Sequence, residues 1–386
     1  MKKSLFFFLS IITLLNVNAQ TAFQNTGNVQ IHPNGSVGFH TNLINDGVFD
    51  KNDGLVGFYS LDNYLVVAGK NEAIFKNVEI DVFDNLYLNT SMGITNDLLF
   101  ITGKVVTPRN DTTISLDFLN HQLYVGEGDA NHVDGYAKVI NQGEFIFPIG
   151  DDNAFRPMIL PNQVANSTYK GAYFREDPNS PSTFNSSFDT ESRQKSIVKV
   201  NTREFWDLDG VKETAVKLTW NIDSGINALA YSVENLRVVG WSSSLGIWFD
   251  LGNVKVTGNL DEGTIESNSF IPDDYEIITI GSDASIVRGI FADSNRNYGI
   301  SPNGDGVNDT FIIKGIEYTP NNTLQIYNRW GILVYSKSGY DNSWGGFSDG
   351  RSTISASVGL PEGTYFYVLE FQAEGLSKQG YIYLKR

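Results

Sequence analysis

Apolar and polar residues alternate along most of the chain after residue 20, and this period of two constrains the fold more than any other feature. Val216, Leu218 and Trp220 fall on one face of an extended segment, with polar residues between them. The segments 78–82 and 145–149 repeat the pattern. Successive side chains of a strand point to opposite faces, so the pattern is typical of strands with one buried face. No window carries a helical stripe, and the sequence therefore predicts an all-β fold.

Short turn sequences separate the predicted strands. They are Pro33–Gly35, Asn45–Gly47, Asn52–Gly54 and Pro302–Gly304, and each ends in Asn-Gly or Asp-Gly. These dipeptides tolerate the positive φ angles of tight hairpins. The chain has 37 glycines but 11 prolines, and aromatic residues make up 13% of it. This composition suits short strands and tight turns better than long helices.

The net charge limits the partners that the chain can have. Its 44 acidic and 28 basic side chains give a formal charge of −16. A field of this sign repels phosphate backbones, so we expect no nucleic-acid partner. The 386 residues include no cysteine, which excludes disulfides, thiolate metal sites and a cysteine nucleophile.

The first residues have the organisation of a secretory signal peptide. Two lysines precede an apolar run from Leu5 to Leu15, and a site with small residues ends at Ala19. The run is too short to cross a membrane, which favours a cleaved signal over an anchor. We therefore expect residues 1–19 to be removed during export, with Gln20 as the first mature residue. No later run approaches the length of a transmembrane helix, so we expect no direct membrane span.

Behind the signal peptide we divide the chain into a β-rich N-terminal module at 20–140, a sandwich-like middle module at 141–284 and a C-terminal domain at 285–386. A loose echo within the first module links Asn-Asp-Gly-Val-Phe at 45–49 to Asn-Asp-Leu-Leu-Phe at 96–100, and a glycine follows each copy. Such weak self-similarity is compatible with a β-solenoid and with an irregular sandwich. Both architectures stay open at this point.

The C-terminal domain carries an ordered series of motifs. In chain order they are ISPNGDGVNDTF (Ile300–Phe311), LQIYNRWG (Leu324–Gly331), WGG (Trp344–Gly346), LPEGTYFY (Leu360–Tyr367) and GYIYLKR (Gly380–Arg386). The series resembles the gliding-motility-associated C-terminal domain, which is the type B sorting domain of the type IX secretion system. Gly345 departs from the family, which usually has aspartate at this place in a Trp-Asp-Gly turn.

The resemblance implies a route and a destination. Proteins with this domain cross the inner membrane by the general secretory pathway and the outer membrane through the type IX translocon. They finish on the cell surface or in the medium, and type B cargo is typically linked to an outer-membrane β-barrel of the PorP/SprF-like family. The resemblance also implies an origin in the Bacteroidota.

The residues of these motifs are compatible with a small Ig-like β-sandwich. Tyr365, Tyr367, Leu369 and Phe371 share one face of a predicted strand, so we expect them in the core. Recognition by the secretion apparatus must then use what the fold leaves exposed. Edge strands are natural candidates, because an unpaired edge can accept the backbone of another chain.

Asn303, Asp305 and Asp309 are the candidate metal ligands. Their oxygen-bearing side chains alternate with Gly304 and Gly306, as ligands and turn residues do in calcium loops. However, no glutamate follows at the spacing of a bidentate ligand. The alternative is a cluster of Asx-turns in which these side chains accept hydrogen bonds from neighbouring backbone N–H groups. Calcium is the only cofactor that the sequence suggests.

Enzyme motifs are scarce. The four histidines, His32, His40, His121 and His132, lie far apart, and the chain has no His-Glu-x-x-His pair, Gly-x-Ser-x-Gly elbow or phosphate-binding loop. Asp151–Asp152 and Asp273–Asp274 are adjacent pairs, which would point to opposite faces of a strand and form no catalytic pair by themselves. We therefore expect no catalytic residues and no cofactor-binding residues.

Four tryptophans lie in the middle module. They are Trp206, Trp220, Trp241 and Trp248, and an exposed aromatic side chain can stack on a sugar. We expect Trp220 in the core because of its alternating row, whereas Trp241 and Trp248 flank a turn, so both core packing and sugar stacking stay open for them.

The first functional hypothesis is a non-enzymatic surface or secreted protein that acts in adhesion, in matrix contact or in assembly with the gliding and secretion apparatus. The second is a carbohydrate-binding or carbohydrate-degrading cargo of the same secretion system. A third is a small accessory component that stays bound to its barrel partner. A pocket lined by two carboxylates would favour the second hypothesis, and a smooth β surface would favour the first.

Overall fold

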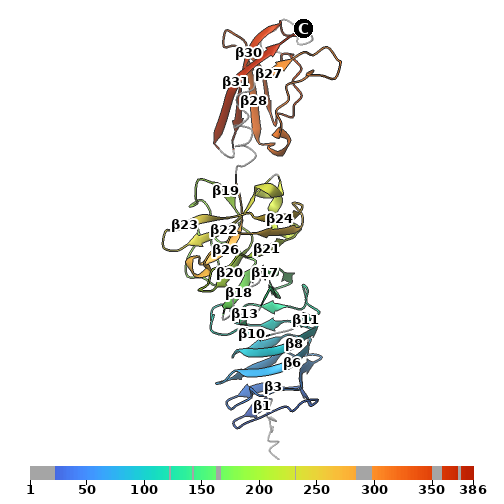
Figure 1. The fold of residues 1–386 in the computed structure, drawn as a ribbon, viewed down its shortest axis with the longest axis vertical. Helices are drawn as coiled ribbons and strands as arrows, with labels where there is room; N and C mark the ends of the chain where they lie inside the picture. Colours follow the sequence, from blue (N-terminus) through green and yellow to red (C-terminus); the bar gives the residue numbers. More distant parts are fainter. Residues whose placement is uncertain are drawn as a thin grey trace, which may run out of the picture.

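The computed structural model describes residues 22–120, 123–140, 143–161, 167–230, 232–283, 298–349, 359–372 and 375–386. It is nearly all β, with 49% strand and 4% helix, and this confirms the all-β prediction. The predicted signal peptide, residues 1–19, and the predicted start of the C-terminal domain at 285 lie outside the described residues. In Figure 1 the parts follow one another in chain order along the longest axis.

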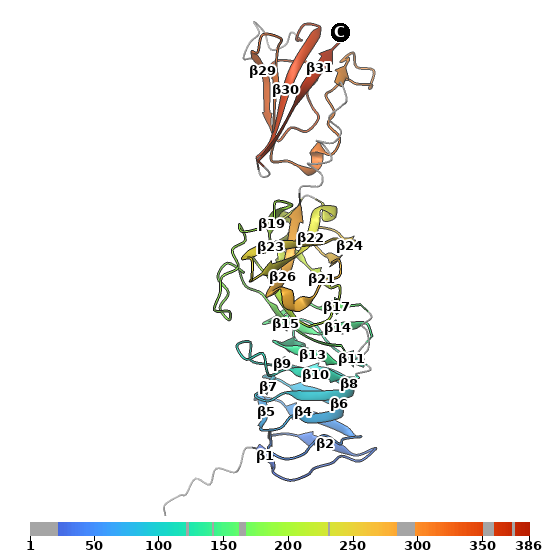
Figure 2. The same ribbon diagram turned by 60° about the vertical axis from the view of Figure 1, so that its left-hand side comes forward.

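The N-terminal part is a β-solenoid, the first of the two architectures left open by the sequence. Two sheets run along it, and their strands are stacked in parallel (Figure 2). The first sheet contains, in spatial order, β1 (Ala22–Asn25), β3 (Asn42–Asn45), β5 (Leu65–Gly69), β7 (Leu86–Leu88), β9 (Val105–Val106), β12 (Val133–Asp134), β15 (Ile149–Asp151) and the antiparallel β16 (Ala154–Phe155).

The second sheet begins with β2 (Ser36–Phe39), β4 (Leu55–Ser60), β6 (Ala73–Val82), β8 (Met92–Thr102), β10 (Leu116–Leu119) and β13 (Ala137–Ile140), while β11 (Leu123–Val125) also pairs with β8. Parallel pairing places like residues of successive coils above one another. Phe75 pairs with Ile94, Phe118 with both Ile94 and Val139, and all four are buried. These columns are the core of the solenoid, because each side chain is covered from both neighbouring coils.

The echo noticed in the sequence does not mark the structural repeat. Asn45 ends β3 in the first sheet, whereas Asn96 lies in the middle of β8 in the second. The structural repeat is defined by strand pairing between successive coils, which places Ala22 beside Asn42 and Ser36 beside Leu55. The paired segments share no sequence motif. Each coil needs only alternating apolar residues in its strands and, at each corner, a residue that tolerates the backbone angles of the turn. Different sequences can therefore form successive coils.

Buried asparagines close one corner of the solenoid. Asn45 is fully buried, accepts a 2.8 Å hydrogen bond from the amide of Asn25 and donates a 3.0 Å bond to the carbonyl of Asn71. Above it, Gly69 has φ +126°, and a Cβ there would lie 2.2 Å from the Asn45 carbonyl oxygen. The corner therefore requires glycine at this position, both for its backbone angle and for the close approach of two coils.

The second sheet continues without a break into the middle module. β13 pairs in parallel with β10 and antiparallel with the next strand of the sheet. The sheet goes on through β18 (Thr168–Phe174), β20 (Phe205–Asp209), β26 (Ile277–Asp283), β22 (Leu236–Ser242) and β23 (Ile247–Gly252), with β19 (Ile197–Val200) on β26. The predicted division at 140 thus falls within one sheet of 13 strands.

A third sheet packs against this extension. Its strands are β14 (Phe145–Phe147), β17 (Met158–Leu160), β21 (Lys217–Trp220), β25 (Gly263–Glu266) and β24 (Lys255–Gly258). Trp220 is buried in the shared core, as expected, and Trp206 is buried there too. The short 3₁₀ turns are η1 (Ile222–Ser224), η2 (Ile226–Ala228), η3 (Val233–Asn235), η4 (Pro272–Asp274) and, in the C-terminal domain, η5 (Ile316–Tyr318).

The C-terminal domain has a sheet and a core of its own. The strand order is β27 (Tyr298–Ile300), β31 (Leu376–Leu384), β30 (Gly363–Phe371), β28 (Asn322–Tyr327) and β29 (Leu333–Ser338). Tyr365, Tyr367, Leu369 and Phe371 are buried, as predicted. In the described part of this domain the layer opposite the sheet comes from irregular segments, including Phe311 and Trp344, rather than from a second sheet. The Ig-like arrangement is therefore not seen there.

Candidate functional site

The first motif of the C-terminal domain forms a loop closed by side-chain oxygens. Asp309 accepts hydrogen bonds of 2.8 Å from the backbone N–H groups of Gly304 and Gly306, one at each carboxylate oxygen. Asp305 accepts from the N–H of Val307 at 2.7 Å and from the amide of Asn303 at 2.9 Å. These bonds lower the pKa of Asp305, with that from Asn303 the main cause.

The structure thus brings the three predicted ligands together in the arrangement of the Asx-turn alternative. All four carboxylate oxygens of Asp305 and Asp309 accept hydrogen bonds, so the loop closes through its own donors. Among the described residues, no group of three or more His, Cys, Asp and Glu side chains is arranged to hold a metal ion. Calcium binding by Asn303, Asp305 and Asp309 stays a prediction.

The structure can accommodate glycine or aspartate at position 345, where this chain departs from the family. A Cβ at this residue would meet only the backbone oxygen of Asp309, at 3.4 Å, so aspartate would also fit. The neighbouring Trp344 carries the structural role of the turn, because it is buried and its indole N–H donates to the carbonyl of Phe347 at 2.9 Å. Its own carbonyl accepts the N–H of Phe311, which ties the turn to the first motif.

Exposed aromatic residues cover the outer face of the sheet. Phe366 pairs with Tyr381 across β30 and β31, and Tyr383 follows on the same face; all three are more than 40% exposed. At the tip of the β28–β29 hairpin, Trp330 is 70% exposed beneath the Arg329 guanidinium, 4.2 Å from its ring centroid. These residues form an exposed aromatic surface on a domain whose core holds other aromatics, among them Phe311, Trp344 and Tyr367.

Comparison with known families identifies this part of the chain. Residues 294–384 match the family model described as the CHU_C type IX secretion signal domain. The chain carries a type IX secretion signal domain at its C-terminus. The resemblance drawn from the five motifs is confirmed. No curated protein and no solved structure matches the chain.

The signal domain defines the route of the protein. It supports export by the type IX secretion system to the cell surface or the extracellular space, and it implies an interaction with that system. Within the described residues, no helix is long and apolar enough to cross a membrane.

The middle module contains a polar cavity that the sequence analysis did not find. Its volume is about 1140 Å³, and its lining includes five carboxylate side chains together with hydroxyl, aromatic and arginine side chains. The carboxylates are Asp207 and Asp209 on β20, Asp273 and Asp274 in η4, and Glu276. We call this the acidic cavity.

Asp207 is a buried carboxylate of the acidic cavity with a shifted pKa. Only 7% of the residue is exposed, and its carboxylate accepts a 2.6 Å hydrogen bond from the hydroxyl of Tyr136. Burial raises the pKa of Asp207 to about 8, and the nearby charges of Asp209 and Glu276 act in the same direction. Burial and the charge of Asp207 also raise the pKa of Tyr136. Asp207 therefore holds a proton at neutral pH.

The other carboxylates already have partners. The ammonium of Lys170 lies 3.2 Å from Asp209, the backbone N–H of Gly210 donates to Asp273 at 2.7 Å, and the hydroxyl of Ser243 donates to Glu276 at 3.2 Å. These bonds hold the oxygens in place around the cavity, as a polar ligand would require.

One adjacent acidic pair lies in a different element from the strand that the sequence analysis considered. Asp273 and Asp274 belong to a 3₁₀ turn rather than to a strand, so both can line the acidic cavity. Asp207 and Asp209 were missed because they sit among buried apolar residues. The available signal was their spacing, since two carboxylates separated by one residue share a face of a strand.

The predicted sugar-stacking tryptophans are core residues. Trp241 is 8% exposed and Trp248 fully buried, and their ring centroids lie 5.7 Å apart. Aromatic groups at the acidic cavity come instead from Phe184, Phe249 and Tyr275. The turn between β22 and β23 does not expose the tryptophans because both side chains face the inner layer of the sheet.

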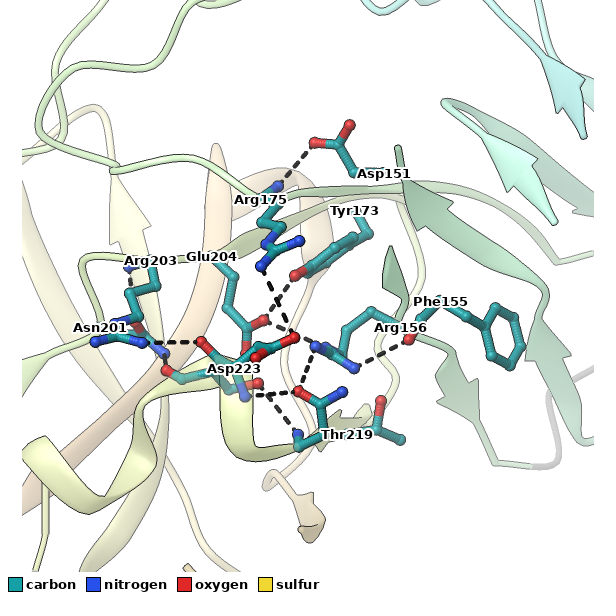
Figure 3. Close-up of polar contacts among 12 residues, drawn as sticks. Asp151, Phe155, Arg156, Tyr173, Arg175, Asn201, Arg203, Glu204, Thr219 and Asp223 are labelled. Carbon is teal, nitrogen blue, oxygen red and sulfur yellow. Dashed lines mark hydrogen bonds and ion pairs between the residues drawn. The ribbon is translucent and has the colours of Figure 1, made fainter. Parts of the chain in front are cut away.

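A second group of charged residues looks like a site but is part of the core (Figure 3). Arg156 and Glu204 are 4% and 1% exposed, and their side chains lie 3.3 Å apart. Tyr173 donates to Glu204 at 2.7 Å, and Arg156 donates to Asn221 at 2.8 Å. Although burial disfavours the charge of Arg156, attraction to Glu204 leaves its pKa raised. Because Arg156 and Glu204 are almost completely buried, we assign this network to the junction of the sheets.

The histidines do not form a site. His32 and His40 are exposed on the first coil, and His121 lies outside the described residues. His132 is buried, which lowers its pKa, and its Nδ1 lies 3.0 Å from the carbonyl oxygen of Gly128.

We predict that Asp309→Ala lowers the melting temperature of the C-terminal domain equally in calcium and in chelator. The substitution leaves two backbone N–H groups without their acceptors, and loss of such a cap costs about 1 kcal/mol. Differential scanning calorimetry of the full mature chain measures it, with Asp341→Ala as an exposed control. A chelator effect in the wild type that Asp305→Ala removes would instead establish the calcium site.

We predict that Asp207→Asn changes how stability depends on pH. The folded pKa of about 8 lies above the ordinary value of 3.8, so stability from protonated Asp207 is complete below pH 4 and lost as the pH rises through 8. Asparagine cannot ionise and keeps an acceptor for Tyr136. The variant should match the wild type at pH 4 and exceed it at pH 8.5 by at least about 1.4 kcal/mol, the equivalent of one pKa unit. Urea unfolding at both pH values measures this, and equal losses in both proteins contradict the assignment.

Proposed function

We propose that this protein is a non-enzymatic surface or secreted binding protein that holds carbohydrate in the acidic cavity. The cavity is the observation that carries the proposal. Sugar hydroxyls need both donors and acceptors, and the lining offers carboxylates beside the hydroxyls of Ser242, Ser243 and Ser244. Phe249 and Tyr275, with ring centroids 6.3 Å apart, add an apolar side against which a pyranose ring can pack.

The charge of the lining narrows the ligand class. Carboxylates outnumber cations at the acidic cavity, and its arginine, Arg109, is already bound to Asp134 at 2.8 Å and to the carbonyl of Gly150 at 2.9 Å. Phosphorylated or uronic acid ligands would meet repulsion from this lining. Neutral or amino sugars are therefore the better fit.

Binding of this kind serves adhesion or matrix contact once the signal domain has delivered the protein outside the cell. The translocon is one partner in that delivery, and we propose a PorP/SprF-like barrel as the partner that retains the protein at the outer membrane. Exposed Trp330, Phe366 and Tyr381 on the signal domain are the residues available for such contacts.

Glycoside hydrolysis at the same cavity is the second candidate. Burial raises the pKa of Asp207, as in a general acid, and Asp209 follows two residues later on β20. Inverting glycosidases likewise pair a carboxylic acid of raised pKa with a second carboxylate. We favour binding without cleavage because Asp207 is almost completely buried and Asp209 is held by Lys170.

We predict that the purified mature protein binds neutral or amino-sugar oligosaccharides and that Asp209→Asn or Tyr275→Ala weakens binding at least about tenfold. Isothermal titration after a glycan array measures the affinity, with Tyr87→Ala on the solenoid as the control. Absence of binding in the whole panel would contradict the proposal. Turnover of a bound glycan that Asp207→Asn abolishes would establish the hydrolase instead.

We predict that deleting residues 285–386 retains the protein in the periplasm of a bacterium with a working type IX system. Truncation before Gly380 should have the same effect, because it removes most of β31, the strand that pairs with both β30 and β27. Cell fractionation and surface immunolabelling compare both forms with the full chain. A matched variant with both Lys385→Ala and Arg386→Ala keeps β31 but removes the two terminal charges. It tests whether these charges contribute to export. Normal surface delivery of the deletion would contradict this role of the domain.

A further inference from the structure

The first coil of the solenoid leaves two strand edges unpaired. Among the described residues, which begin at 22, β1 pairs with β3 alone and β2 with β4 alone, so each ends its sheet. We call the surface formed by residues 22–39 the open end. An unpaired edge exposes backbone N–H and C=O groups to which another strand can bind.

The stacked rows of core side chains inside the solenoid end in residues that are partly exposed to solvent at the open end. Phe23 stands in register with Leu43, which is fully buried, yet Phe23 is 41% exposed. In the other sheet, Val37 is half-buried while its paired residue Val56 is fully buried. These side chains occupy core positions and lack only a further coil to cover them. Solenoids that are stable alone usually end in a repeat with a polar outer face.

The same surface has no charged side chain. Residues 20–45 contain no Asp, Glu, Lys or Arg, whereas the next 26 residues, 46–71, contain six. Soluble proteins normally protect an exposed strand edge with charges, lysine above all. The open end thus combines unpaired edges and exposed core positions with an absence of the charges that would prevent association.

We propose that the open end binds the open end of a second copy of this chain, so that two solenoids join head to head. A two-fold axis perpendicular to the sheets places β1 antiparallel to its counterpart and β2 antiparallel to its own, and both sheets then continue across the contact. Phe23 and Val37 become covered by the same residues of the other copy.

A second copy is the occupant that matches both strand edges of the open end at once, because it presents β1 to β1 and β2 to β2 at the same spacing. Each chain has a formal charge of −16, so two copies repel each other over most of their surfaces. Residues 22–39 contribute no carboxylate to the contact, and the neighbouring Asp46 accepts a 3.0 Å hydrogen bond from the amide of Gln24. The resulting dimer presents one acidic cavity and one signal domain from each chain.

The oligomeric state of the mature chain, residues 20–386, tests the proposal. We expect sedimentation equilibrium to give a dimer for the wild type. Phe23→Glu and Ser36→Lys should each raise the dimer dissociation constant at least about tenfold, since both copies then bring the same charge to the contact. Ser36 is exposed, so its substitution leaves the fold intact. Leu61→Glu, at a residue 89% exposed on a later coil, is the control and should not change dimerisation.

A cysteine pair locates the contact. Because the chain contains no cysteine, Gln24→Cys adds a single thiol on β1, and Leu61→Cys adds one elsewhere. A short bis-maleimide should cross-link the first variant into a covalent dimer and leave the second monomeric. A wild-type monomer, or a dimer that neither charge variant weakens and that Gln24→Cys does not cross-link, overturns the proposal.

Discussion

The continuous pairing of one 13-stranded sheet supports most of this protein. Buried backbone N–H and C=O groups must find partners, and a strand within a sheet finds them on both sides. Each solenoid coil therefore depends on the coil beside it. The same ladder crosses from β13 to β18 and positions β20, from which Asp207 and Asp209 reach the acidic cavity. Two of the five carboxylates of the acidic cavity are thus carried by an interior strand of the sheet, and the other three lie in η4 and at Glu276.

Burial then decides which charged residues are structural and which remain open to a ligand. Arg156 and Glu204 are enclosed and neutralise each other within the core. Asp207 is nearly as buried but faces other carboxylates and a tyrosine, and it avoids the cost of a buried charge by keeping its proton. An acidic chain without cysteine thus builds a polar cavity without a disulfide.

In the signal domain, aromatic residues occur both in the core and on the outer face of the sheet. Its own core holds one row of aromatic residues from β30, while Phe366 and the tyrosines of β31 remain on the outer face. The alternation of a single strand therefore provides both the fold and the surface that the secretion apparatus can recognise. At the opposite end of the chain the alternation has the same result, because Phe23 would be buried by one further coil.

The sequence by itself determined the fold class, the buried row Tyr365–Phe371 and the identity of the signal domain, because alternation and turn residues are local properties. It also placed Asn303, Asp305 and Asp309 in one loop, since a segment of seven residues cannot separate them widely. Only the tertiary structure decided between solenoid and sandwich, which differ in strand pairing and not in strand pattern. It alone revealed the acidic cavity, where residues more than 60 positions apart, such as Asp207 and Glu276, come together. Burial of Trp241 and Trp248 was likewise decided by packing between layers, for which the sequence offers no local signal.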